Sequence, residues 1–348
     1  MARNQVAKRP RRRNKLAAAQ VNRQEAAARR PTQQQEIGML PRLLVRVGVI
    51  AVIIGVVVVM MRLGATQTQE KEAPKPARNL SPAEEARVKA RVERRAAARP
   101  SVDVLAKYPH DKAAFTQGFT VINSGHNKIF IESTGLYGES NLRHVDIESG
   151  KVLKQYDLPK ELFGEGVTQG PNDELVMLTW KSKTGLVFDL DVAADSKDDG
   201  FTLKREFKFD TVTGEGWGIT YDGEEFVISD GSSTLMFWDP STMEEVRSVD
   251  VSMYDGTQKI SQINELEFAK GFVYANVWYH PYVLKIDPET GGIVTMFDLS
   301  KLVTDAGVDV SSGDVLNGIA YDDADDVFYI TGKRWGAVYK VRLVDPVQ

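Results

Sequence analysis

A short phrase that recurs five times limits the possible folds of this chain more than any other feature. Each copy has a polar residue, then a small or acidic one, and then apolar alternation: FTQGFT (115–120), FGEGVT (163–168), EGWGIT (215–220), INELEF (263–268) and LNGIAY (316–321). The equivalent positions are spaced by 48, 52, 47 and 53 residues and are occupied by Gln117, Glu165, Trp217, Asn264 and Asn317. A period near 50 residues is typical of repeat architectures.

The residues after each phrase predict strands. A turn and then a β-branched or aromatic run follow every copy: NKIFIEST, DELVMLTW, EEFVISDG, GFVYANVW and DVFYITGK. Such runs, bounded by turn residues, are typical of strands. Two more alternating runs with Asp, Pro, Gly or Ser between them come next, as in LMFWDPSTMEEVRSVDV. Each repeat therefore predicts about four antiparallel strands.

Four-stranded units repeated around an axis form a β-propeller. The sequence thus predicts an all-β, five-bladed β-propeller over residues 102–348. The last repeat is one strand short, and the run VDVLAKY (102–108) precedes the first phrase. We expect this N-terminal strand to complete the last blade and close the ring. The innermost strands line the channel of a propeller, so the five phrases should gather around one axis, where their glycines let backbones approach closely.

The chain before the propeller has the opposite charge. Residues 1–65 contain 13 Lys and Arg against two acidic residues, a net charge of +11, whereas the remainder carries −15. The uncharged run VGVIAVIIGVVVVMM (47–61) lies between Arg46 and Arg62. It is short for a span of about 20 residues, but flanking leucines and snorkelling arginines can extend it. We expect a basic cytosolic tail (1–42), a transmembrane signal anchor (43–65) and a helical stem (66–101).

Basic residues before the apolar run predict a single-pass type II membrane protein. The propeller would then face the lumen of the endoplasmic reticulum or Golgi, or another extracytoplasmic space. A cleaved signal sequence ending near RLGA and an organellar transit peptide remain alternatives. The stem contains SPAEEARVKARVERRAAARP, with the end signals of an exposed helix, and the glycosylation sequon of Asn79 is followed by Pro82. The chain has no cysteine, so disulfides contribute nothing to its stability.

Eleven motifs, in order, resemble those of the plant and bacterial type of glutaminyl-peptide cyclotransferase (glutaminyl cyclase). They are FTQGF, ESTGLYGESNLR, FGEGVT, LTWK, EGWGIT, SDGSSTLMFWDP, INELE, ANVW, IDPETG, LNGIA and TGK, over about residues 103–343. The resemblance implies a five-bladed propeller that acts as an aminoacyltransferase. Its partners would be peptides and proteins with an N-terminal glutamine, which it converts to pyroglutamate with release of ammonia. No nucleic-acid partner is expected.

The resemblance also implies a set of site residues, all of which are present here. The implied catalytic residues are Glu165, Asn264 and Lys333, and the implied substrate-binding residues are Phe115, Gln117, Phe163, Trp180, Trp217 and Trp278. The sequence departs from the family pattern after TGK, where KRWGA stands in place of a Trp-Pro pair.

The residue types suit this chemistry on their own terms. In the cyclisation, the α-amine of the substrate attacks its own γ-carboxamide, so the nucleophile is tethered and needs only orientation. One carboxylate among indole rings can move both protons, because desolvation raises the pKa of a carboxyl group towards neutrality. Asn and Lys side chains can stabilise the tetrahedral oxygen. We therefore expect Glu165 to transfer protons, and Glu215 to support it or to bind a metal.

Other interpretations stay open. The propeller could be a non-catalytic lumenal scaffold, or a glycan-active enzyme, which would need two or three carboxylates around the axis. No cofactor is expected for the chemistry, and the histidines (His110, His126, His144 and His280) lack the spacing of zinc ligands. The resemblance implies a structural metal ion with unidentified ligands. A divalent cation held on the axis by Glu215, Glu265 or Glu267 is the open alternative.

Overall fold

The computed structural model of the chain describes residues 99–124, 127–190, 201–253 and 256–346, all within one compact unit. The expected cytosolic tail and membrane anchor, and the stem up to residue 98, lie outside the described residues, as does the sequon at Asn79. Within the described ranges, no helix is both long enough and apolar enough to cross a membrane.

The described residues form five antiparallel sheets of four strands each, as predicted. The first sheet contains β2 (Thr116–Ser124), β3 (Asn127–Thr134), β4 (Asn141–Asp146) and β5 (Val152–Asp157). The second contains β6 (Gly164–Gln169), β7 (Glu174–Thr179), β8 (Thr184–Leu190) and β9 (Phe201–Lys208). The third contains β10 (Ile219–Tyr221), β11 (Phe226–Ile228), β12 (Thr234–Trp238) and β13 (Glu245–Asp250).

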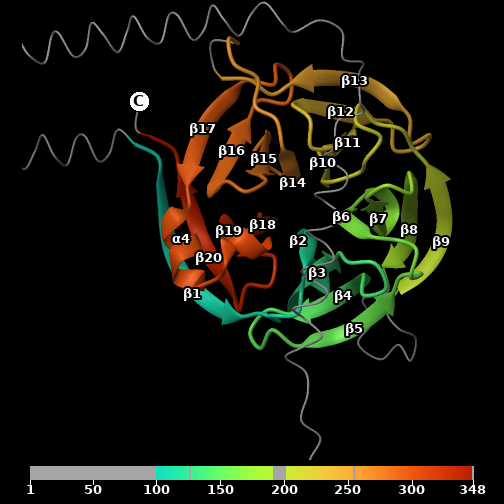
Figure 1. Cartoon of the computed structure of the whole chain (residues 1–348), viewed down its shortest axis with the longest axis horizontal. Coiled ribbons are helices and arrows are strands. Elements are labelled where there is room, and N and C mark those ends of the chain that lie inside the picture. The colour runs from blue at the N-terminus through green and yellow to red at the C-terminus, as the bar shows by residue number, and fades with distance from the viewer. Residues whose placement is uncertain (1–98, 125–126, 191–200, 254–255, 347–348) are drawn as a thin grey trace, which may run out of the picture. The chain divides into compact units, whose positions relative to one another are not determined.

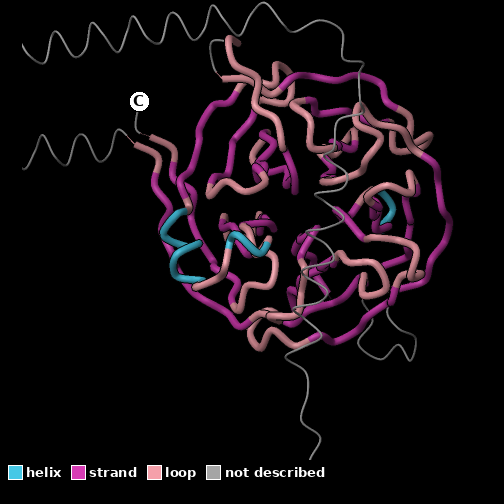
Figure 2. Tube along the Cα trace, viewed as in Figure 1, coloured by secondary structure: helices cyan, strands magenta, loops and turns pink. Residues whose placement is uncertain are grey.

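The remaining two sheets complete the ring (Figure 1). The fourth contains β14 (Ile263–Ala269), β15 (Phe272–Val277), β16 (Tyr282–Ile286) and β17 (Ile293–Asp298). The fifth contains β18 (Leu316–Asp322), β19 (Val327–Gly332), β20 (Ala337–Val344) and β1 (Ser101–Pro109). The helices described are short: η1 (Pro171–Asp173), α4 (Ser300–Ala306) and η2 (Val310–Ser312). Figure 2 shows how little of the ring they occupy beside the strands.

The ring closes through the N-terminal strand, as the sequence predicted. Strand β1 runs antiparallel to β20, with Ser101 opposite Val344 and Pro109 opposite Ala337. The innermost strands β2, β6, β10, β14 and β18 surround the axis and contact their neighbours around the ring (Figure 1). The five phrases therefore do meet around one axis.

An apolar cluster fills the space between each pair of neighbouring sheets. Between the first and fifth sheets, for example, the rings of Phe130 and Tyr329 lie 5.0 Å apart, and Phe130 is 1 % exposed. The outer strands β5 and β13 instead alternate between exposed and partly buried residues. The inner and middle strands are instead buried along nearly their whole length, because both of their faces pack against neighbouring sheets.

The repeated phrase marks an irregularity in the sheet. In β6, Glu165 and Gly166 together face one residue of β7, and the same two-against-one register occurs at Asn264 in β14 and at Asn317 in β18. In β2, Gln117 is the extra residue. Such β-bulges re-aim side chains at the ends of strands and are common beside active sites.

Glycines in the phrases let the inner strands approach one another, as expected. A Cβ atom on Gly166 would lie 2.7 Å from the Trp217 carbonyl oxygen, and one on Gly218 would lie 2.1 Å from the Asn264 carbonyl oxygen. Both distances are too short for any side chain. The hydrogen bond from Gly166 N to Trp217 O, at 2.7 Å, depends on this approach. These glycines thus set the spacing of the residues beside them.

Candidate active site

Glu165 lies at the centre of the candidate site, in the bulge that begins β6. Its side chain is 4 % exposed, and its Oε1 accepts a hydrogen bond of 3.1 Å from Gln117 Nε2, on the neighbouring inner strand. Ser133 in β3 donates its Oγ hydrogen to the Glu165 carbonyl oxygen. The first blade therefore holds Glu165 at two points, its carboxylate through Gln117 and its backbone through Ser133.

A first aromatic wall stands beside Glu165. The ring centroids of Phe115 and Phe163 lie 6.3 Å apart at 89°, and those of Phe163 and Trp180 lie 5.3 Å apart. Tyr137, from the loop between β3 and β4, adds a ring 5.4 Å from Phe163. Burial, followed by the nearby negative charges of Glu165 and Glu215, raises the pKa of the Tyr137 hydroxyl. Tyr137 is therefore part of the site, although the sequence analysis did not select it.

A second aromatic wall comes from the third and fourth blades. Trp217 and Trp278 meet edge to face, with centroids 5.5 Å apart. Glu215 joins the two walls, because its Oε2 accepts hydrogen bonds from Trp180 Nε1 at 2.7 Å and from Trp217 Nε1 at 3.0 Å. Its Oε1 pairs with Lys181 Nζ at 3.3 Å. Glu215 therefore links the tryptophans of the two walls to each other.

The two polar residues expected near the reacting amide occupy different blades. Lys333, 4 % exposed at the end of β19, places Nζ 4.7 Å from the ring centroid of Phe115. Asn264, 3 % exposed, is held by Ser229 Oγ, which donates to its carbonyl oxygen at 2.5 Å. Its buried Oδ1 has no hydrogen-bond partner within the described ranges. A buried acceptor of this kind is costly unless a ligand or water satisfies it.

A buried ionic network lies under the start of β2. The Glu132 carboxylate, fully buried, contacts His110 Nε2 at 3.0 Å, Arg143 Nε at 3.0 Å and Thr116 Oγ1 at 2.6 Å. Burial alone would raise its pKa, but the charges of His110 and Arg143 lower the pKa of Glu132 to about 2. Burial lowers the pKa of His110, but the attraction of the Glu132 carboxylate for the protonated imidazole is stronger, so the pKa of His110 is raised. Because Thr116 precedes Gln117, this network positions the first phrase.

Two further carboxyl groups lie along the axis. Glu265 accepts hydrogen bonds from Phe119 N at 3.2 Å and Ile319 N at 2.9 Å, so it links three blades. Burial and then repulsion from Glu267 raise the pKa of Glu265 well above its usual range. Burial also raises the pKa of Glu267 to about 8. No group of three or more His, Cys, Asp or Glu side chains suited to a metal was found among the described residues.

The structure brings the predicted site residues to one end of the ring. Side-chain contacts run from Lys333 through the first wall and Glu215 to the second wall, and Gln117 reaches Glu165. Asn264 joins through its backbone, packed against Gly218. Sequence reasoning missed Leu136, which packs against Phe115 and Phe163 in a strained conformation with φ of 94°. Its only signal was the aromatic and glycine content of STGLYGES.

Comparison with known proteins gives consistent results. The sequence model of the glutamine cyclotransferase family matches residues 78–343. A glutaminyl-peptide cyclotransferase of Arabidopsis thaliana is 37% identical over 243 residues, which cover 70% of this chain and 71% of that protein. The crystal structure of Myxococcus xanthus glutaminyl cyclase matches with a TM-score of 0.62 and 33% identity, over 72% of this chain and 99% of that one.

Proposed function

The chain belongs to the glutamine cyclotransferase family, and on that basis we propose that it converts the N-terminal glutamine of peptides and proteins to pyroglutamate, releasing ammonia. The observation that carries the proposal is the buried Glu165 carboxylate, which is hydrogen-bonded to Gln117 and lies close enough to Tyr137 of the first aromatic wall to raise the pKa of its hydroxyl. One proton-transferring group in an apolar cage is what an intramolecular amide exchange requires.

Glu165 moves the protons in this mechanism. The neutral α-amine of the substrate attacks the γ-carboxamide carbon and forms a C–N bond, and Glu165 takes the proton that the amine loses. Glu165 then donates a proton to the leaving nitrogen, the original C–N bond breaks, and ammonia departs. The acid regains its starting state, so no external oxidant, reductant or cofactor is consumed.

Two further polar residues orient the bound glutamine and stabilise the tetrahedral intermediate. The Lys333 ammonium and the Asn264 amide are donors suited to the tetrahedral oxygen, each contributing a few kcal/mol when well aimed. The Asn264 Oδ1 atom, buried without a partner within the described ranges, can accept a hydrogen from the bound glutamine. The tryptophans exclude water and pack against the methylene groups of the substrate.

A direct test follows the ammonia. The purified chain is incubated with a Gln-initiated peptide and with matched Asn- and Glu-initiated peptides. Released ammonia is measured, together with the mass of each peptide, which falls by roughly 17 Da when ammonia leaves. Release from the Gln peptide is expected. A non-catalytic scaffold would release none, and a glycan-active enzyme would act on oligosaccharides instead.

Adding a zinc chelator to the same assay tests the proposal that the chemistry needs no zinc. Unchanged turnover is expected.

Replacing Trp217 with alanine is expected to raise KM about tenfold or more while kcat changes much less. The indole forms a wall that binds substrate and transition state alike, so its loss removes uniform binding. Trp217→Phe is the matched control, because it keeps an aromatic wall but loses the hydrogen bond to Glu215. Steady-state kinetics separate the two effects, and a fall in kcat alone for Trp217→Ala would contradict the assignment.

We also propose that residues 43–65 anchor the chain in a membrane as a type II protein, with the propeller on the lumenal or extracytoplasmic side. The proposal rests on the net charge of +11 before residue 66 and on the apolar run 47–61. Protease added to sealed microsomes should spare the propeller and remove the basic tail. Digestion of the propeller with the tail left intact would reverse the orientation.

A further inference from the structure

A second pocket lies beside the proposed glutamine pocket, on the first blade. We propose that it binds a basic side chain, Lys or Arg, of the substrate residue that follows the N-terminal glutamine. This inference rests on the proposed function and extends it to the choice of substrate.

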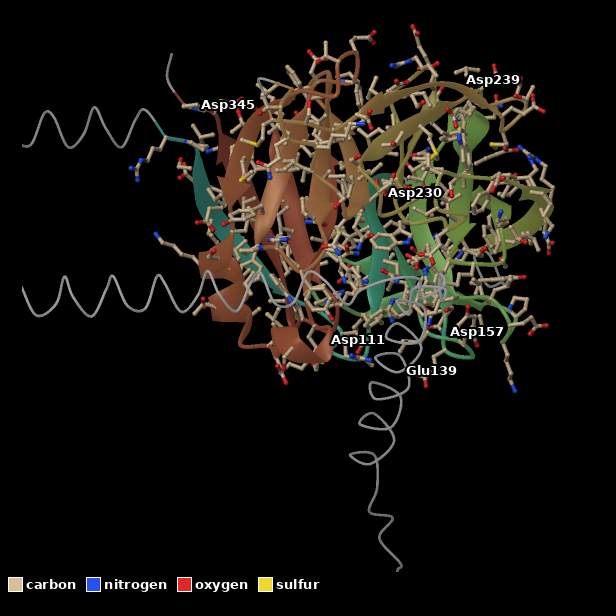
Figure 3. The ribbon with its side chains drawn as sticks, turned by 45° about the horizontal axis from the view of Figure 1, so that its top comes forward. Asp111, Glu139, Asp157, Asp230, Asp239 and Asp345 are labelled. Atoms are coloured by element: carbon tan, nitrogen blue, oxygen red, sulfur yellow. The ribbon has the colours of Figure 1, made fainter. Side chains whose placement is uncertain are left out.

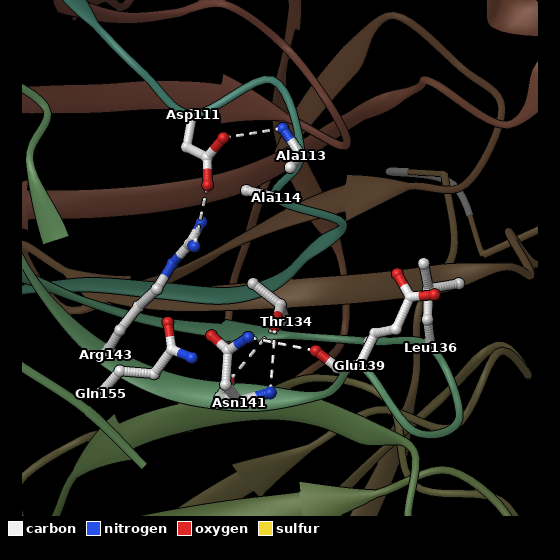
Figure 4. A pocket seen from close by; sticks show the side chains of 10 residues that line it. Asp111, Ala113, Ala114, Thr134, Leu136, Glu139, Asn141, Arg143 and Gln155 are labelled. Carbon is white, nitrogen blue, oxygen red and sulfur yellow. Dashed lines mark hydrogen bonds and ion pairs between the residues drawn. The ribbon is translucent and has the colours of Figure 1, made fainter. Parts of the chain in front are cut away.

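The pocket has a volume of about 210 Å³ and lies at the end of the ring where the inner strands begin (Figure 4). Its walls are the loop that carries Asp111 and Ala114 and the segment from the end of β3 to the start of β4. Asp111 and Glu139 lie at one end of the ring, opposite Asp239 and Asp345 (Figure 3). This volume accommodates one side chain.

The two pockets share a wall. Leu136 lines the second pocket and also packs against Phe115 and Phe163 of the first aromatic wall. Ala114, another lining residue, directly precedes Phe115, whose carbonyl oxygen accepts a hydrogen bond of 2.9 Å from Gly135 N. Consecutive Cα atoms of a peptide are only about 3.8 Å apart. A glutamine held beside Phe115 therefore brings the next residue of the substrate to this pocket.

The charged groups of the pocket favour a cation. The carboxylates of Asp111 and Glu139 lie on different sides of it (Figure 4). The one guanidinium in its lining, that of Arg143, is already paired with the buried Glu132 at 2.9 Å and with Asp111 at 3.1 Å. No described residue forms an ion pair with the Glu139 carboxylate. The pocket therefore keeps excess negative charge.

The side-chain oxygen of Asn141 is a second reason to expect a ligand with hydrogen-bond donors. Asn141 donates through Nδ2 to the Glu139 carbonyl oxygen at 3.1 Å, while its Oδ1 is buried with no hydrogen-bond partner among the described residues. Lys and Arg side chains supply several N–H donors and no acceptor. An acidic side chain would face two carboxylates, and an aliphatic one would leave the amide oxygen unsatisfied.

The test compares peptides that differ only in their second residue. Gln-Arg, Gln-Lys, Gln-Ala and Gln-Glu peptides of equal length are assayed for kcat/KM at low and moderate salt. A preference of roughly five- to tenfold for the basic peptides over Gln-Glu is expected, mainly through KM and weaker at higher salt, as for one or two partly exposed ion pairs.

Variants of Glu139 then test whether the second pocket causes the preference for basic peptides. Glu139→Gln keeps the shape of the pocket but removes its exposed charge, and should reduce the preference to about twofold. Glu139→Lys should reverse it. Glu148→Gln is the matched control, because Glu148 is also exposed on the first blade but lies in the turn at the other end of β4.

The outcomes separate this inference from the proposed function. Equal kcat/KM for all four peptides, or an unchanged preference in Glu139→Gln, would overturn the second pocket while leaving the cyclase activity in place. Failure to release ammonia from any of the peptides would instead reject the proposed function, and the inference that rests on it.

Discussion

Glu165→Gln is expected to lower turnover by about 10² to 10⁴, the range typical of losing general acid–base catalysis. Glutamine has the same shape and can still bond to Gln117, so the substrate pocket should survive. It cannot accept and return a proton, however. The measurement is kcat for a Gln-initiated peptide, with circular dichroism to verify folding. A folded variant that keeps more than about a tenth of wild-type turnover would reject the role.

Glu215→Gln is the matched control for this experiment. Glu215 carries the same functional group at the same end of the ring, but its contacts are two indole N–H groups and Lys181. Glutamine can still accept from at least one indole, so kcat should fall by less than about tenfold and KM should rise. A loss in Glu215→Gln that matches or exceeds the loss in Glu165→Gln would move the proton transfer to Glu215.

Glu132→Gln is expected to lower the free energy of unfolding by roughly 3 kcal/mol at neutral pH, since a pKa lowered from 4.5 to about 2 corresponds to stabilisation of that size. The change leaves the Arg143 guanidinium and His110 without their central buried partner. Such an uncompensated buried charge is strongly destabilising. Chemical denaturation of the purified chain gives the measurement.

The stabilisation that Glu132 provides depends on pH, and its pKa gives the direction of that dependence. Because the folded-state pKa of Glu132 is lowered, its stabilisation is complete above about pH 4.5 and is lost as the pH falls towards 2. The raised pKa of His110 acts in the opposite direction, since its stabilisation is present below about 6.5 and is lost as the pH rises through the folded-state value. Wild type should therefore lose more stability than Glu132→Gln between pH 4.5 and 2.

Glu267→Gln is the matched control for burial without ionisation. Glu267 is also a buried glutamate, but burial raises its pKa to about 8, so it is mostly neutral at pH 7. Glutamine keeps an oxygen that can accept from Tyr321 N, the bond of 2.7 Å that Glu267 accepts. At pH 7 the wild type must protonate Glu267 on folding, which costs stability, so Glu267→Gln is expected to cause no loss in the free energy of unfolding. A loss as large as that of Glu132→Gln would indicate an ionised Glu267, as a cation on the axis would require.

The fold was largely predictable because it is a repeat. Five phrases about 50 residues apart define five blades, and the orphan run at 102–108 has a partner only in the last blade, where β1 pairs with β20. The bulges were visible only as a polar residue next to a small one. Their register depends on pairing with the second strand, as at Gly164 opposite Thr179, and therefore had to come from the structure.

The candidate site was predictable where residues belong to the phrases and less so where loops supply them. Tyr137 lies in a loop whose path is not periodic, and its place beside Phe163 depends on how neighbouring blades pack. The contact from Trp180 to Glu215 joins residues 35 apart on different blades. Glu132 reads as an ordinary strand residue, because only the closed ring brings His110 to it.

The pairing of β1 with β20 has a consequence for biosynthesis. Ser101 leaves the ribosome long before its partner Val344, and at roughly 5 to 20 residues per second the intervening chain of about 240 residues takes roughly 10 to 50 s to make. Through that interval β1 is an unpaired strand bearing Val104 and Leu105, which are exposed even in the closed ring. Such an edge can pair with another nascent chain. Strand β20, the last strand of the ring to be translated, is therefore also the one that ends this risk of aggregation.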